Sequence, residues 1–153
     1  MKLRSATRQD IPSLVRLLQI LFSQEEEFTP NPTLQEAGLR AILSDPRVGE
    51  ILLAEEEGRS LGMVSLLYTV STALGAPVAI LEDMVVDPST RGVGVGGALL
   101  ERAVQICRAR GCARVTLLTD QGNAGARRFY GRFGFATSAM IPLRLSLRKG
   151  EER

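Results

Sequence analysis

The chain has 153 residues, of which 44% are hydrophobic and 24% are charged, and its formal net charge is +2. A chain of this length buries about 70% of the surface that its unfolded form exposes, so we expect one domain over residues 1–153. The mixed charges, and the absence of an apolar run near the roughly 18 residues of a membrane span, argue against a nucleic acid or membrane partner and favour a cytoplasmic protein.

Hydrophobic spacing divides the first half of the chain into one strand, two helices and a hairpin. After an N-cap at Thr7, the apolar residues from Ile11 to Leu21 recur at helical spacing. A second helix begins at the capping box Thr33–Glu36 and ends near Ser44. Strands are predicted at residues 3–6, 48–54 and 61–72.

The second half alternates strands with helices. Residues 78–86 are apolar on both faces, as expected of a strand covered on both sides, and the following helix stops at Gly111. The predicted elements are strand 78–86, helix 94–110, strand 113–119, helix 123–133 and strand 135–147. The order of strand, two helices, three strands, helix, strand, helix and strand predicts an α/β (α+β) fold with a mixed, mostly antiparallel sheet and helices on both faces.

The residue types that are present restrict the chemistry. Histidine is absent, which excludes Ser-His and Cys-His nucleophile pairs, a histidine base and histidine metal ligands. Cys107 and Cys112 lie close together around a predicted helix end, which is neither a disulfide framework nor a zinc pattern, and we interpret them as structural thiols. Acid–base chemistry is therefore left to Glu, Asp, Tyr, Lys or Cys, and no metal is expected.

Glycine is concentrated where strand 78–86 passes into the next helix. The segment reads Arg91-Gly92-Val93-Gly94-Val95-Gly96-Gly97 and places several amides free of side chains at a helix N-terminus, where an anion such as a phosphate is favoured. A Walker loop is excluded because no Gly-Lys-Ser or Gly-Lys-Thr ends the segment. Gly92, Gly94 and Gly97 also match a dinucleotide pattern that Asp120 would complete, but too little chain follows for a doubly wound domain.

The glycine segment and its surroundings resemble the GNAT N-acetyltransferases over almost the whole chain. Residues 91–96 fit that family's motif of Arg or Gln, X, X, Gly, X, Gly or Ala. The similarity extends to Asp87-Pro88, to Asn123, to the run Ala126-Arg127-Arg128-Phe129-Tyr130 and to residues 131–135. It implies the GNAT fold and acetyl-coenzyme A as co-substrate.

The resemblance also implies which residues hold acetyl-coenzyme A. Amides of the glycine segment would bind the pyrophosphate, and backbone groups of the preceding strand would pair with the pantetheine arm where that strand splays from strand 113–119. Asn123 would hydrogen-bond the arm, although Asn is also a favoured helix cap. The implied cofactor-binding residues are Met84, Val85, Val86, Arg91, Gly92, Val93, Gly94, Val95, Gly96, Gly97, Asn123 and Ala126.

An amine acceptor needs a base, because a lysine-like amine with a pKa near 10.4 is only about one part in 2,500 neutral at pH 7. Glu82 is the candidate, since a carboxylate in an otherwise apolar strand must be solvated, paired or functional. Its rival Asp83 would point to the opposite face under strict alternation, which groups Glu82 with Met84 and Val86. Both carboxylates could instead be structural partners of arginines.

Tyr130 occupies the position of the family's tyrosine acid. A phenol with a pKa near 10 stays protonated at neutral pH and can donate to the leaving thiolate, although packing beside Phe129 and Phe133 is the alternative. The sequence therefore predicts direct acetyl transfer to a primary amine of a small molecule or peptide. A non-catalytic acyl-coenzyme A sensor is the other possibility, and the apolar segment from Leu66 to Ile80 would suit either a homodimer or the core.

Overall fold

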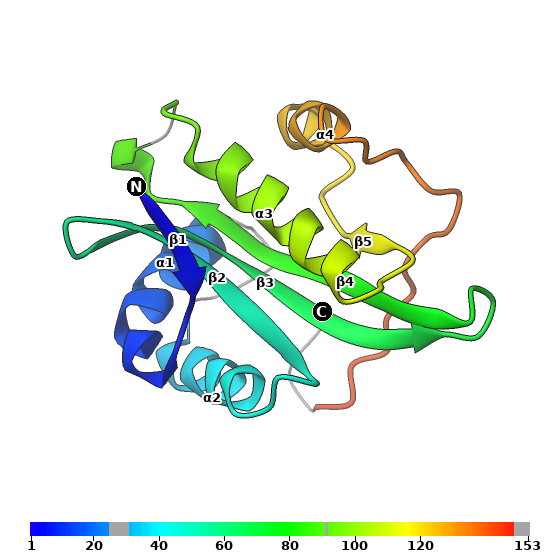
Figure 1. Ribbon diagram of the computed structural model, residues 1–153, viewed down its shortest axis with the longest axis horizontal. Coiled ribbons are helices and arrows are strands. Elements are labelled where there is room, and N and C mark those ends of the chain that lie inside the picture. The colour runs from blue at the N-terminus through cyan, green and yellow to red at the C-terminus, as the bar shows by residue number, and fades with distance from the viewer. Residues whose placement is uncertain (25–30, 91, 149–153) are drawn as a thin grey trace. The chain divides into compact units, whose positions relative to one another are not determined.

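The computed structural model describes residues 1–24, 31–90 and 92–148 (Figure 1). The chain forms two compact units: the first, Met1–Leu118, contains a β-sheet, and the second, Thr119–Arg153, contains a helix. The single domain expected over residues 1–153 stays a prediction.

The first unit is built on a five-stranded sheet in the order β1-β2-β3-β4-β5. The first four strands are antiparallel to their neighbours, whereas β5 is parallel to β4. The strands are β1 Lys2–Ser5, β2 Gly49–Glu56, β3 Arg59–Ser71, β4 Ala76–Val86 and β5 Val115–Leu117. This confirms the mixed, mostly antiparallel sheet and excludes a doubly wound parallel one.

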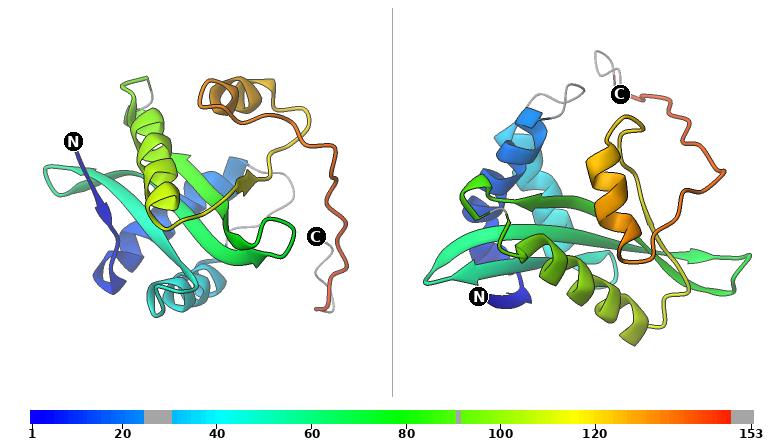
Figure 2. Two further views of the ribbon diagram at one scale, coloured as in Figure 1. Left: turned by 45° about the vertical axis from the view of Figure 1, so that its right-hand side comes forward. Right: turned by 90° about the horizontal axis from the view of Figure 1, so that it is seen from above.

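Helices cover both faces of this sheet (Figure 2). On one face lie α1 (Ile11–Gln24), preceded by the short helix η1 (Arg8–Asp10), and α2 (Pro32–Leu43); on the other lies α3 (Val95–Ala109), preceded by the short helix η2 (Pro88–Thr90). Neighbouring residues of β3 mark the two faces. A side chain at Gly62 would meet Val95 and Leu99 of α3, whereas Met63 is buried with Leu14 and Leu17 of α1.

The cap of α2 differs from the prediction, whereas Thr7 is an N-cap as predicted. Asn31, and not the expected box at Thr33–Glu36, caps α2, since its side-chain oxygen accepts a hydrogen bond from the Leu34 amide at 3.2 Å. Before α1, Thr7 and Asp10 form a capping box in which the Thr7 amide donates to Asp10 Oδ2 at 2.7 Å. An Asn oxygen suits the N-cap as well as a Thr hydroxyl does.

The second unit contains α4, Ala124–Gly131, within the predicted 123–133. The strand predicted at 135–147 is wrong, because the structure has no strand in the described residues 135–148. A strand needs a hydrogen-bonded neighbour as well as an alternating sequence. The alternating apolar side chains Ile141, Leu143, Leu145 and Leu147 are instead 77–90% exposed.

Candidate active site

The glycine segment forms a turn that opens onto the N-terminus of α3. Gly92 and Gly94 have φ of 91° and 83°, in the left-handed region that favours glycine. Gly94 is the N-cap and has no side chain that could occupy the first-turn amides of Val95, Gly96 and Gly97. These amides lack intrahelical acceptors, so they are available to an anion, which the helix dipole also favours.

Not every side chain of the turn faces outward. Val93 is 71% exposed, whereas Val95 is 2% exposed and packs toward β3 at Gly62. Val95 can therefore offer only its backbone to a ligand. Arg91 lies outside the described residues.

Asp87 anchors the start of this turn. Its carboxylate, 7% exposed, accepts hydrogen bonds from the Ser89 amide at 2.9 Å and the Ser89 hydroxyl at 2.8 Å. It also accepts from Arg16 Nη1 of α1 at 2.8 Å and from Arg59 Nη2 of β3 at 3.3 Å. These hydrogen bonds hold the pKa of Asp87 far below its usual range. The largest effect comes from the Ser89 amide, the next from Arg16 and the third from the Ser89 hydroxyl.

The sequence does not predict this clamp, in which Arg16 and Arg59 hold the carboxylate of Asp87. Asp87-Pro88 resembles the family, but nothing local in the sequence marks Arg16 or Arg59 as partners of Asp87. Arg16 also donates to the Ser60 carbonyl oxygen at 2.7 Å, and the Asp87 amide donates to the Leu61 carbonyl oxygen at 2.7 Å. The clamp therefore joins α1, the beginning of β3 and the turn.

A β-bulge in β4 changes which faces its last residues occupy. Ser65 pairs with Glu82 and Met63 with Val85, so two steps along β3 match three along β4. Asp83, with a φ of 53°, lies in the bulge. One extra residue inverts the alternation beyond it.

Strict alternation is therefore wrong for this strand. Val86, opposite Gly62, lies on the α3 face. Glu82, opposite Ser65, lies with Val85 on the face of α1 and α2. The expected grouping of Glu82 with Val86 fails for this reason.

Glu82 is exposed although it lies on the face that α1 and α2 cover elsewhere. Among the described residues its carboxylate makes no hydrogen bond or ion pair, whereas Asp83 and Met84 are half-buried and Val85 is 4% exposed. Ile80, two residues earlier on the same face, pairs with the exposed Thr116 of β5. The sheet thus presents an open carboxylate beside a partly apolar surface.

The pairing of β4 with β5 ends before this carboxylate. The paired residues are Ala79 with Val115, Ile80 with Thr116 and Leu81 with Leu117. From Glu82 to Val86, the β4 backbone is bonded to β3 alone among the described strands. No described strand pairs with its other edge, which leaves backbone groups that an extended ligand could join.

The remaining predicted residues lie in the second unit. The Asn123 side-chain oxygen accepts a hydrogen bond from the Ala126 amide at 3.0 Å, so both residues take part in the N-cap of α4. The half-buried Tyr130 makes edge-to-face contacts with Phe129 and Phe135, with ring centroids 5.2 and 5.8 Å apart. Burial raises the pKa of Tyr130, which keeps its hydroxyl protonated.

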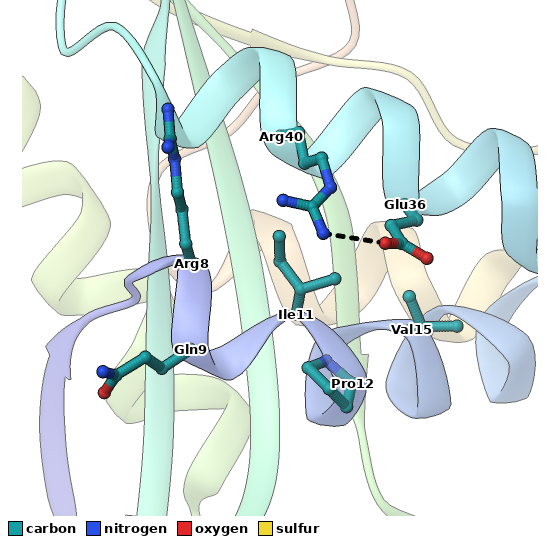
Figure 3. Close-up of a pocket in the computed structure, with 7 residues that line it drawn as sticks. All are labelled: Arg8, Gln9, Ile11, Pro12, Val15, Glu36 and Arg40. Carbon is teal, nitrogen blue, oxygen red and sulfur yellow. Dashed lines mark hydrogen bonds and ion pairs between the residues drawn. The ribbon is translucent and has the colours of Figure 1, made fainter.

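A separate hollow of about 430 Å³ lies between the start of α1 and α2 (Figure 3). It contains the Arg40–Glu36 ion pair, whose atoms are 2.9 Å apart, and none of the predicted site residues lines it. In the described parts of the chain no cluster of three metal-ligating side chains occurs, and no helix is long and apolar enough to cross a membrane.

Known proteins agree with this fold. An uncharacterized N-acetyltransferase YhfO of Bacillus subtilis is 34% identical over 138 residues, covering 88% of this chain and 89% of that protein. The glucosamine 6-phosphate N-acetyltransferase of Trypanosoma brucei brucei is 32% identical over 88% of each chain. The solved structure of a putative acetyltransferase from Agrobacterium tumefaciens superimposes with a TM-score of 0.80 at 28% identity, covering 95% of this chain and 100% of that one. Residues 12–135 match the acetyltransferase (GNAT) family, and the chain belongs to it.

Proposed function

We propose that this protein transfers the acetyl group of acetyl-coenzyme A directly to the primary amine of a small molecule or peptide. The observation that carries the proposal is one stretch of chain, from Glu82 to Gly97. It combines an open carboxylate, an unpaired strand edge and a helix N-terminus with free amides. Family members use acetyl-coenzyme A as co-substrate.

The first-turn amides of α3 suit the pyrophosphate, because left-handed Gly92 and Gly94 leave them uncovered. The open edge of Met84 to Val86 suits the amide-bearing pantetheine arm, which would add to the sheet as an extended strand does. Bound in this way, acetyl-coenzyme A supplies an activated thioester.

Glu82 is proposed as the base. Deprotonating an amine of pKa 10.4 at pH 7 costs about 4.6 kcal/mol, and a carboxylate that receives the proton, directly or through water, lowers this barrier. Glu82 is preferred to Asp83 because it is exposed on the open face, whereas Asp83 is half-buried in the bulge and has an interaction of its own.

Tyr130 is proposed as the acid that protonates the departing thiolate. Its raised pKa keeps the hydroxyl protonated at neutral pH, so that it can donate to the forming thiolate. Asn123 and Ala126 are proposed to contact the arm through groups that the cap leaves free, such as the Asn123 side-chain NH₂.

The acceptor is proposed to lie on the face of Ile80, Glu82 and Thr116, where a carboxylate, a hydroxyl and an aliphatic side chain adjoin. The T. brucei relative is named for a small phosphorylated amino sugar, which supports a small-molecule amine over a peptide.

The test measures thiol release from acetyl-coenzyme A with glucosamine 6-phosphate, spermidine, free amino acids and a peptide N-terminus as acceptors. We expect turnover with at least one small amine and an acetylated product by mass spectrometry. Tight binding of acetyl-coenzyme A by calorimetry without any turnover would support the sensor instead.

A further inference from the structure

The C-terminus of α3 brings the two cysteines together. Gly111, with a φ of 78°, ends the helix in a Schellman motif. In this motif the Cys112 amide donates to the Cys107 carbonyl oxygen at 2.9 Å and the Gly111 amide to that of Arg108 at 3.0 Å. A contact between the side chains of the third-last helical residue and the residue after Gly frequently accompanies this motif, and here both residues are cysteines.

The backbone on each side of the cysteine pair is held in place by its neighbours. Cys107 is 1% exposed on the core side of α3. Beyond Cys112, the Ala113 amide donates to the Pro77 carbonyl oxygen at 2.8 Å and the Ala79 amide to that of Arg114 at 2.9 Å, which attaches this segment to β4. Burial, and after it the neighbouring Cys112, raise the pKa of Cys107 to about 12.

A cavity of about 360 Å³ opens at the pair. Its lining contains both cysteines and the guanidinium-bearing Arg108 and Arg114, together with Val104, Ala113 and Val115. Cys112 is only partly buried. Cys112 can therefore be reached by a small reagent that enters this cavity, whereas Cys107 is shielded from outside reagents.

We propose that Cys107 and Cys112 are a reactive dithiol that closes into an intrachain disulfide by exchange with a low-molecular-weight disulfide. Cys112 is the attacking thiol and Cys107 the resolving thiol. This site is independent of acetyl transfer, and it gives both cysteines a role beyond the structural one expected from the sequence.

The exchange has two steps. The Cys112 thiolate attacks one sulfur of RSSR, the S–S bond breaks, and RS⁻ leaves and takes a proton, so that Cys112 carries a mixed disulfide. The Cys107 thiol then gives its proton to solvent and attacks the Cys112 sulfur, which displaces the second RS⁻. Two protein thiols are oxidised and one disulfide is reduced to two thiols.

The experiment exposes the folded, reduced protein to oxidised glutathione, blocks free thiols with N-ethylmaleimide after unfolding, and maps the tryptic peptides without reduction. Trypsin cleaves after Arg102, Arg108, Arg110 and Arg114, so the cysteines fall in separate peptides, 103–108 and 111–114. We expect these peptides joined by a disulfide, with a mass lower by two hydrogens than the sum of the reduced peptides.

Variants separate the two roles. Cys107→Ala should stop at the glutathione adduct of Cys112, and Cys112→Ser should leave Cys107 unmodified on the same time scale. For wild type, the equilibrium constant for disulfide closure should be about tenfold larger in the folded chain than in urea, a shift of about 30 mV. This comparison needs no variant to fold.

Three outcomes would overturn the proposal: a stable glutathione adduct on wild-type Cys112 beside an alkylated Cys107, disulfide-linked dimers, or closure that is no better in the folded chain than in urea.

Discussion

Asp87 and Arg16 lie 71 residues apart in the sequence and are joined by a hydrogen bond of 2.8 Å between Arg16 Nη1 and Asp87 Oδ2. Through this contact, α1 supports the turn that precedes α3. The geometry of the proposed pyrophosphate site therefore depends on a helix that lies far from it in the sequence.

Asp87→Asn should lower the free energy of unfolding by about 1–3 kcal/mol, because a buried acceptor of charge-assisted hydrogen bonds is lost. It should also weaken acetyl-coenzyme A binding by calorimetry. Asp45→Asn is the matched control, since Asp45 pairs with a 90% exposed Arg47 and such pairs contribute about 0–1 kcal/mol. Equal effects of the two changes in urea unfolding would contradict the clamp.

Stability should fall in acid partly through Asp10. Hydrogen bonds from Arg4, both at 2.8 Å, are the main cause that lowers its pKa from 3.8 to about 2. A carboxyl whose pKa is lower in the folded state stabilises above its unfolded pKa, and that contribution is lost as the pH falls from about 4 to 2. Asp10→Asn should flatten the unfolding free energy over this window, measured by urea titrations at several pH values. An unchanged slope would refute this assignment.

Gly94→Ala should destabilise the protein by about 1–2 kcal/mol, because the left-handed conformation strains an L side chain, although a Cβ there would meet nothing within 4 Å. The control is Gly38→Ala in α2, where a Cβ would also meet nothing within 4 Å. This substitution should raise the free energy of unfolding by about 0.5–1 kcal/mol, because Ala favours a helix more than Gly does. Thermal or urea unfolding measures the stability of both variants. Effects of the same sign would contradict a special role for the left-handed conformation of Gly94. Acetyl-coenzyme A affinity should fall for Gly94→Ala alone.

Glu82→Gln should reduce kcat/KM about 10²- to 10⁴-fold at pH 7 for a strongly basic amine, and much less for a weakly basic amine that is already neutral. Glu101→Gln, an exposed change on α3, is the control. Steady-state thiol release with both kinds of amine measures the difference. A loss that is the same for both amines would remove Glu82 from proton transfer and leave Asp83 to be tested.

Tyr130→Phe keeps the aromatic contacts with Phe129 and Phe135 and removes the hydroxyl alone. It should lower kcat about 10²-fold or more, if the hydroxyl is the acid, with little change in the free energy of unfolding. Full turnover in the same assay would reduce Tyr130 to a packing residue.

Much of this architecture follows from local sequence signals. Each of these signals lies within a short segment: the helical spacing from Ile11, the end of α3 at Gly111 and the glycine segment before Val95. The structure and the family match confirm the fold that these signals predict. The roles of Glu82, Tyr130 and the cofactor-binding residues stay predictions.

Features that depend on pairing between distant segments were not predicted. The bulge at Asp83 is a matter of register between β3 and β4, so alternation alone put Val86 on the wrong face. Residues 141–147 alternate as a strand does, but an alternating sequence does not show whether a partner strand is present to pair with it. The arginines that hold Asp87 come from α1 and β3, which no local motif connects.

The short junction of β4 with β5 also bears on motion. Three register pairs attach β5, whereas β3 and β4 share nine, so amide protons of β5 should exchange with deuterium faster than those of β3. Opening this junction should cost less than disrupting the packing around Leu14 and Met63, which are fully buried. A cofactor arm could therefore enter and leave while the interior stays closed, and its arrival should slow exchange from Glu82 to Val86.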